Sequence, residues 1–189
     1  QNFSGIPSMA DSLAFNKFNA ALGALTSIEV TLVLETNGGV LRLDNNGENP
    51  ASGSFEFGAK GSISSGDVTL LNSSFIAIPG TVNAYHSQAF ALAASDGMLY
   101  IGGIEIDSKS GLVGSDAWAG YTGAGTYNIS YSVMPWFDYG SIGGIEYFFT
   151  PVNANGSVTV IYNYNPIPEP ATIALLVPAI IALRNKRKK

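Results

Sequence analysis

The side chains of this chain that could support acid–base or nucleophilic chemistry are few. His86 is the only histidine, there is no cysteine, and aspartate and glutamate together number 14. A nucleophile needs an adjacent base, most often histidine, and zinc needs several His or Cys ligands. With no Gly-x-Ser-x-Gly motif in the chain, we interpret His86 as a loop or edge-strand residue. The acids suggest no particular glycosidase pair, so the residue types predict a protein that is not an enzyme.

One loop carries enough side-chain oxygens to bind a hard cation. Asp44, Asn46 and Glu48 alternate along the segment 44–49, directly after an expected strand. Calcium takes carboxylate and amide oxygens as ligands. Gly47 comes too early for an EF-hand loop, so we favour a polar hairpin turn and expect no cofactor, with calcium as the alternative. A looser acidic group consists of Glu105, Asp107 and Asp116.

Aromatic residues are dense between positions 118 and 147. Such rings usually fill cores or interfaces, and their polar edges also suit recognition surfaces. The density leaves open a stacking platform for the sugar rings of an exopolysaccharide. Its candidate residues are Trp118, Tyr121, Trp136 and Tyr139, with Phe137 and Tyr147 nearby.

The elements that must position these residues are β-strands. In the segment 27–35, apolar and polar residues alternate with the two-residue period of a half-buried strand. Asn37-Gly38-Gly39 follows and predicts a hairpin to the next strand. Only the segment 9–25 contains helix formers, enough for a turn or two. The expected strands are 27–35, 40–43, 54–63, 68–78, 88–94, 98–106, 127–134, 144–149 and 157–164. Eight or nine strands separated by turn residues predict an all-β fold, an antiparallel β-sandwich of jelly-roll or Ig-like type.

The charge distribution excludes one class of partner. Five of the nine basic residues occupy the last six positions, so residues 1–170 carry four positive and fourteen negative charges. This body has a net charge of −10, against −5 for the whole chain. Because proteins bind nucleic acids largely by neutralising phosphates, we exclude DNA and RNA as partners.

The last 22 residues consist of three consecutive parts. Pro168-Glu169-Pro170 precedes an uncharged, largely apolar segment at 171–183 and a basic cluster at 184–189. As a helix, 13 residues span roughly 20 Å, against about 30 Å of hydrocarbon. Cationic tails are held on the cytoplasmic side of membranes. We therefore expect a short hydrophobic helix that retains the chain transiently at the cytoplasmic membrane. The retaining cations are Arg184, Lys186, Arg187, Lys188 and Lys189.

Motif, apolar run and basic end, in this order at the C-terminus, resemble the PEP-CTERM sorting signal of Gram-negative bacteria. The resemblance implies that an exosortase-type processing enzyme recognises Pro168, Glu169 and Pro170 and cleaves near them. It also implies export to the cell surface or extracellular matrix of a bacterium. Since the chain begins at Gln1 without an apolar leader, we expect that a signal peptide has been removed.

Two stretches of the body resemble the choice-of-anchor E domains. In residues 15–35, Phe18, a short polar link, Leu22-Gly23-Ala24-Leu25 and an alternating strand follow the opening pattern of that family. Residues 121–126 (YTGAGT), followed by another alternating strand, are similar to an element near its end. The resemblance implies an exported, β-rich surface domain with an interchangeable anchor and no established catalytic residues. The stretch 136–149 does not fit the pattern.

Together these observations predict three parts. Residues 1–164 form an exported β-sandwich, 165–170 a proline-rich spacer with the processing motif, and 171–189 the sorting signal. We expect a non-enzymatic surface or matrix protein. A carbohydrate-binding module is the first alternative. A self-assembling matrix or filament subunit, whose strand edge is completed by a neighbouring copy, is the second.

Overall fold

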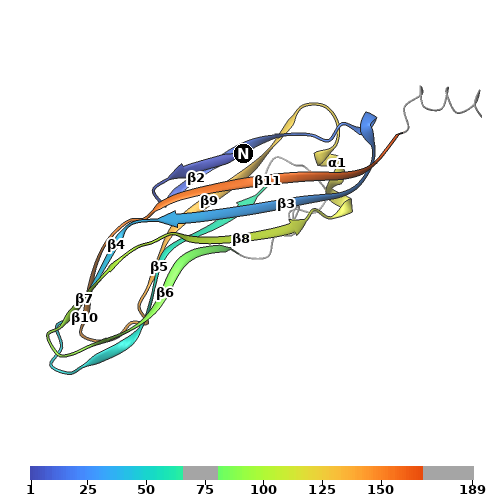
Figure 1. Ribbon diagram of the computed structural model, residues 1–189. Helices are drawn as coiled ribbons and strands as arrows, with labels where there is room; N and C mark the ends of the chain where they lie inside the picture. The colour runs from blue at the N-terminus through green and yellow to red at the C-terminus, as the bar shows by residue number, and fades with distance from the viewer. Residues whose placement is uncertain (66–80, 168–189) are drawn as a thin grey trace, which may run out of the picture.

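The described part of the chain is almost entirely β-structure, arranged in two layers. The computed structural model describes residues 1–65 and 81–167 (Figure 1). The expected strand at 68–78 and the C-terminal signal at 168–189 lie outside these ranges. The strands are β1 (Asn2–Gly5), β2 (Met9–Asn16), β3 (Gly23–Asn37), β4 (Val40–Asn45), β5 (Ala51–Ser64), β6 (Val82–Leu92), β7 (Gly97–Ile101), β8 (Glu105–Leu112), β9 (Thr126–Asp138), β10 (Ile145–Thr150) and β11 (Asn153–Pro166).

These strands form three antiparallel sheets, as expected for a β-sandwich. One sheet has the order β1-β11-β3-β8, a second the order β10-β4-β7 and a third the order β2-β9-β5-β6. The first two belong to one layer, because β3 leads directly into β4 and β10 directly into β11. The third sheet is the opposite layer, and Figure 1 shows that the whole is elongated along the strands.

Glycines break this layer without reversing the chain, so the predicted hairpin at Asn37-Gly38-Gly39 is wrong. Gly38 and Gly39 have φ angles of 71° and 75°, which side chains other than glycine rarely adopt. β4 continues the course of β3, since β11 pairs with Asn37 and β10 pairs with Val40. At the same level Gly102 donates a hydrogen bond to the Gly39 carbonyl, 3.0 Å away. A Cβ on Gly102 would overlap the Gly38 carbonyl oxygen.

The described residues contain eleven strands rather than eight or nine, because β1 and β2 were not expected and one expected strand, 98–106, is interrupted at this level. β3 and β4, β7 and β8, and β10 and β11 each form one extended segment interrupted at this level. The expected single strand at 98–106 is therefore two strands, separated at Gly102 and Gly103. Counted as extended segments, residues 1–65 and 81–167 form eight.

The core lies between the layers and follows the two-residue period. On β3, Ile28, Val30, Leu32 and Leu34 are at most 1% exposed. They belong to one continuous hydrophobic cluster with residues of the opposite sheet. Those residues include Phe55, Ala59, Val82, Ala84, Ile129 and Val133. Burial of one face of each strand fixes the register, because a slip by one residue would expose all of these side chains.

The segment 9–25 is mostly strand, which was not expected, and it contains one helical turn, within the turn or two expected. β2 pairs with β9 over its whole length, from Met9 opposite Val133 to Asn16 opposite Thr126. Only Ala20–Leu22 (η1) form a single 3-10 turn, capped by the Asn19 side chain, which accepts a hydrogen bond from the Ala21 amide at 3.0 Å. Pairing with a neighbouring strand outweighs the weak local helix propensity.

Candidate functional site

His86 lies on β6, an edge strand of its sheet, as its sequence context predicts. Its Nδ1 lies 2.9 Å from Glu105 Oε1 on β8, and its ring stacks on Tyr100 of β7 with 4.8 Å between centroids. Both His86 and Glu105 side chains are about one-third exposed. These contacts join the neighbouring edges of the two layers and provide a structural role for the histidine.

The loop that follows β4 is organised by a residue that the sequence analysis did not select. Asn45 is 1% exposed, and its Nδ2 donates to the carbonyls of Asn49 at 2.9 Å and Ala93 at 2.8 Å. Its Oδ1 accepts a hydrogen bond from the Gly47 amide. A buried amide with three partners fixes the loop.

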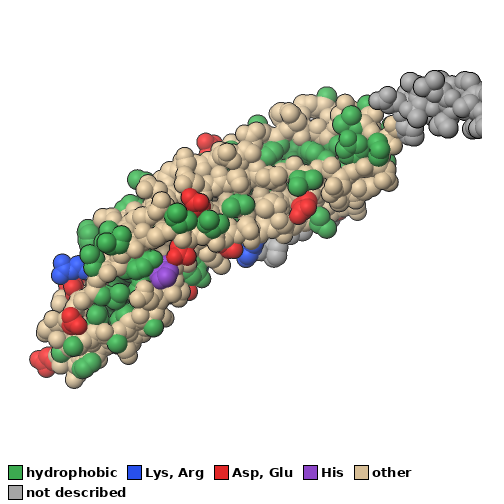
Figure 2. All heavy atoms as spheres, in the orientation of Figure 1, with side chains coloured by type: hydrophobic (Ala, Val, Ile, Leu, Met, Phe, Trp, Pro, Cys, Tyr) green, Lys and Arg blue, Asp and Glu red, His purple; other side chains and the backbone are tan. Residues whose placement is uncertain are grey.

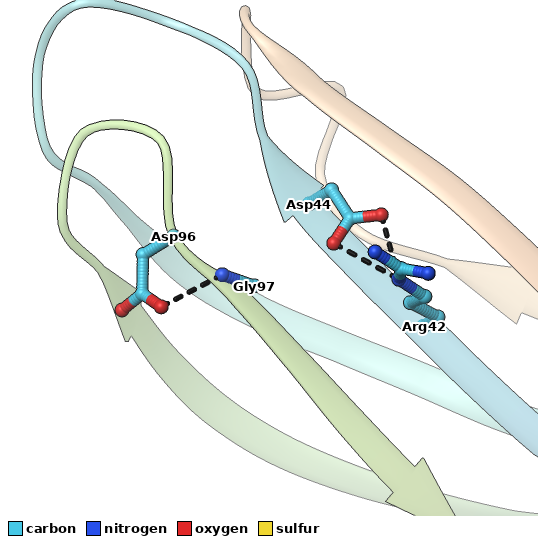
Figure 3. Close-up of polar contacts among 4 residues, drawn as sticks. All are labelled: Arg42, Asp44, Asp96 and Gly97. Atoms are coloured by element: carbon cyan, nitrogen blue, oxygen red, sulfur yellow. Dashed lines mark hydrogen bonds and ion pairs between the residues drawn. The ribbon is translucent and has the colours of Figure 1, made fainter.

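Two carboxylates near this loop, Asp44 and Asp96, already have partners within the chain (Figure 3). Asp44 faces Arg42 of the same strand, with 2.8 Å between Nε and Oδ2. Asp96 accepts a hydrogen bond from the Gly97 amide at 2.8 Å. Asp44, Asn46 and Asp96 line one shallow pocket, whereas Glu48 is not among its lining residues. Across residues 1–65 and 81–167, no three or more His, Cys, Asp or Glu side chains are placed to hold a metal ion. Calcium at Asp44, Asn46 and Glu48 stays a prediction.

The four aromatic residues selected from the sequence are not brought together. Trp118 and Tyr121 belong to the one-turn helix α1 (Trp118–Tyr121), which follows the 3-10 turn η2 (Ser115–Ala117). Trp118 is half-buried and its Nε1 donates to the Val113 carbonyl at 3.1 Å. Tyr121 is fully buried, so it has no exposed ring face to offer a ligand. Trp136 and Tyr139 lie at the other end of β9, roughly 30–40 Å of strand away.

Trp136 belongs to a small aromatic and charged group on the outer face of the β2-β9-β5-β6 sheet. Trp136 and Tyr85 lie on either side of Gly58, which is paired with both in the register. Their ring centroids are 6.4 Å apart. Glycine at the central position adds no side chain between the two rings, and the Lys60 side chain reaches over both of them.

Polar side chains surround these two rings. Trp136 Nε1 donates to Glu56 Oε2 at 2.6 Å, and Lys60 Nζ lies 3.0 Å from the Trp136 ring centroid. Tyr85 also shares a hydrogen bond with Glu56, and burial, together with the Glu56 carboxylate, raises the pKa of this tyrosine. Asp138 lies opposite Glu56 in the register. We call Tyr85, Trp136, Glu56 and Lys60 the outer aromatic face; it combines ring surfaces, a hydrogen-bond acceptor and a cationic donor.

Tyr139 belongs to a second group, which consists of four rings. They meet where β10 and the last residues of β9, beyond the end of β2, are both sheet edges. Phe137 packs against Tyr147 at 4.8 Å, Tyr139 at 5.5 Å and Phe149 at 5.6 Å between centroids. Tyr147 is 51% exposed and Phe149 37%. This edge cluster (Phe137, Tyr139, Tyr147, Phe149) continues into the core through Phe57, 6.2 Å from Phe149.

Neither group could be assembled from the sequence alone. Trp136 and Phe137 are neighbours in sequence but point to opposite faces of β9, so they belong to different groups. Tyr85, Glu56 and Lys60 come from two other strands, and only the register places them beside Trp136. The available signal was the alternation along each strand, which assigns faces but not neighbours.

Comparisons with known proteins add little to this description. No protein-family model and no curated protein matches the sequence. Among solved structures, one of infectious bursal disease virus Gx strain has 11% identity and a TM-score of 0.17, covering 100% of this chain and 50% of that one. A structure of the Gt strain has 13% identity and a TM-score of 0.12, covering 95% and 45%. The chain thus spans about half the length of these proteins, and such low scores support no statement about its function.

None of the helices in the ranges 1–65 and 81–167 combines the length and the apolar character that crossing a membrane requires.

Proposed function

We propose that this chain is a non-enzymatic, exported surface or matrix domain, delivered through its C-terminal sorting signal. The observation that carries the proposal is the order of Pro168-Glu169-Pro170, the apolar run and the basic end. An exosortase-type enzyme of a Gram-negative bacterium would process it near Glu169. Residues 171–189 would hold the chain at the cytoplasmic membrane until then.

The shape of the body is compatible with this role. β11 ends at Pro166, paired with Gly23, at the same end of the sandwich as η1 and α1 (Figure 1). The strands β10 and β11 run back from there to Ile145, roughly 70 Å of extended chain. A body tethered through its C-terminus would therefore direct β10 and its aromatic residues away from the membrane.

We also infer a jelly roll as the topology of the sandwich. With the eight extended segments numbered along the chain, one layer has the order 1-8-3-6 and the other 2-7-4-5. These are the two interleaved sheets of a jelly roll, a fold that occurs in lectin and capsid domains. Because a fold does not determine a function, this inference leaves the sorting proposal unchanged.

The test is the intact mass of the protein recovered from its native host. We expect a surface or medium species that ends near Pro168 to Pro170. The Glu169→Ala variant should fold normally and stay in the membrane fraction at full length. A wild-type surface species ending at Lys189, or normal processing of the Glu169→Ala variant, would contradict the proposal.

A second candidate function, binding of exopolysaccharide, is favoured by the outer aromatic face. A sugar ring could stack on Trp136 or Tyr85 while its hydroxyls bind Glu56 and Lys60. The net charge of −10 on residues 1–170 favours a neutral polymer over an anionic one.

Co-sedimentation with the producer's own polysaccharide measures this binding. We expect Trp136→Ala to abolish it and Met134→Ala to leave it unchanged. Met134 is the matched control because it lies on the same strand and face and is 56% exposed. Equal binding by the two variants would exclude the outer aromatic face as the binding surface.

A further inference from the structure

β10 is an edge strand with one side unpaired. Its register partner is β4, from Ile145 opposite Asn45 to Thr150 opposite Val40. Among the described residues, no other strand pairs with it. Its outer backbone amides and carbonyls therefore form a row that can accept another strand.

The side chains of β10 make this edge unusually apolar. Tyr147 is 51% exposed, Phe148 63% and Phe149 37%. Tyr147 and Phe149 lie on the inner side of the sheet, within the edge cluster, and Phe148 lies on the outer side. The strand contains one charged residue, Glu146, and neither lysine nor proline. Exposed aromatic edge strands of this composition associate with other strands.

Most of the other long edges carry protective features that β10 lacks. β8 contains three charged residues, whereas β2 and β10 contain one each, Asp11 and Glu146. Asp107 of β8 accepts a hydrogen bond from the Asn83 amide of β6 at 2.7 Å, so these two edge strands cover each other. On β7, the edge opposite β10 in the same sheet, His86 stacks on Tyr100. Charges and covering contacts prevent edge-to-edge pairing.

Figure 2 shows hydrophobic side chains gathered at the end of the molecule that contains β4, β7 and β10. The most exposed are Ile101 at 70%, Phe148 at 63% and Leu99 at 61%. Phe148 and Leu99 face the same side of the sheet, because Arg42 lies opposite both of them in the register. Phe148 lies on the edge strand β10, and Leu99 lies on the opposite edge strand, β7.

We propose that β10 pairs antiparallel with β10 of a second copy of this chain, forming a two-fold symmetric dimer with a continuous sheet across the interface. The inference goes beyond the proposed function and does not depend on the sorting signal. Another β-strand has backbone donors and acceptors at the spacing that complements this row, whereas a sugar chain does not. A two-fold contact also needs one self-complementary patch.

β10 meets that requirement when the two-fold axis passes through Phe148. Phe148 then faces its own copy, and Tyr147 faces Phe149, so aromatic residues meet across the strands. Glu146 faces Thr150, which keeps the two Glu146 carboxylates from lying opposite each other. Because each body carries a net charge of −10, added salt should strengthen the dimer by screening their repulsion.

Sedimentation velocity of the full chain, with two matched lysine variants, tests the proposal. Phe148→Lys places two like charges opposite each other, which should weaken the dimer at least about tenfold. Leu99→Lys makes the same substitution at a similarly exposed site on the opposite edge strand and should leave the dissociation constant within about twofold. Both side chains are largely exposed, and circular dichroism checks that both variants fold.

A covalent readout uses the absence of cysteine from the chain. Directly opposite residues of antiparallel strands have Cα atoms about 4.5–5.5 Å apart, within the range of a disulfide. Phe148→Cys should therefore give a disulfide-linked dimer under mild oxidation, whereas Leu99→Cys should stay largely monomeric. A wild-type chain that stays monomeric up to about 1 mM overturns the proposal. So does equal weakening by the two lysine variants, or equal cross-linking by the two cysteine variants.

Discussion

The two ends of the sandwich treat the same residue types in opposite ways. At the end that contains α1, Tyr121 and Tyr127 are at most 2% exposed, with ring centroids 4.6 Å apart. At the end that contains β10, Tyr147 is 51% exposed and Phe148 63%. We call these the covered end and the open end.

The difference comes from what covers the edges of the strands at each end. At the covered end, the segment before η1 closes over the helix: the Phe18 amide donates to the Tyr121 carbonyl at 2.8 Å, and the Gly123 amide donates to the Phe18 carbonyl at 2.9 Å. At the open end, β2 pairs with β9 only as far as Val133, and β1 pairs with β11 only as far as Ala154, so the last residues of β9 and all of β10 are edges. Tyr121 and Tyr127 therefore stabilise the fold at the covered end, whereas the aromatic side chains of β10 are available for contacts at the open end.

The largest expected effect is a difference between the two ends in how much stability is lost when a tyrosine is replaced by alanine. Tyr121→Ala should lower the free energy of unfolding by about 3–5 kcal/mol, since it empties a fully buried site. Tyr147→Ala should cost about 1 kcal/mol, because half of its ring is already exposed. Urea denaturation of both variants measures the difference. Equal losses would mean that the open end is as tightly packed as the covered end.

The next largest effect is expected at the glycine breaks of the layer, at Gly38, Gly39 and Gly102, which lie between the two ends. Gly102→Ala should cost about 1–3 kcal/mol, because its Cβ would overlap the Gly38 carbonyl oxygen. Gly103→Ala is the control, since no atom lies within 4 Å of its Cβ position. Thermal unfolding compares the two. If both variants unfold at the same temperature, close packing at the break is not what joins the two halves of the layer.

The fold class was predictable from the sequence, and the arrangement of the site was not. Strict alternation, as at Ile28 to Leu34 on β3, depends only on local burial and identified strands correctly. The path at Gly38 and Gly39 was missed because a turn signal reports positive φ angles and does not say whether the chain reverses. The outer aromatic face needs the register of three strands, which depends on long-range pairing.

A smaller effect, in alkaline solution, compares one tyrosine from each end. Burial raises the pKa of Tyr162, whose hydroxyl donates to Asn16 at the covered end, and of Tyr100 at the open end. A raised pKa in the folded state means that the folded chain holds the proton more tightly. The resulting stability is complete below about pH 10 and is lost as the pH rises through the folded-state pKa.

Denaturation curves at several alkaline pH values test this linkage. Tyr162→Phe and Tyr100→Phe should each make the decline of stability with pH shallower. Tyr162→Phe should also cost about 1 kcal/mol at neutral pH, because it removes hydrogen bonds to Asn16 and Tyr127. An unchanged alkaline slope in both variants would contradict the role of burial.

The smallest effect concerns the Arg42–Asp44 pair at the open end. Arg42→Met should change the free energy of unfolding by less than about 1 kcal/mol, because the arginine side chain is 60% exposed and water screens the pair. Urea denaturation in low and high salt measures it. A larger loss, or one that salt does not reduce, would mean that this surface pair is a structural element of the open end.

Hydrogen exchange of the full-length protein at increasing concentration tests the central claim, that the open end is the surface through which copies associate. We predict that amides of residues 145–150 exchange more slowly as concentration rises, because a second β10 protects them. Amides of residues 97–101, on the opposite edge of the same sheet, should not change. Concentration-independent exchange at 145–150, or equal protection of both edges, would contradict the account.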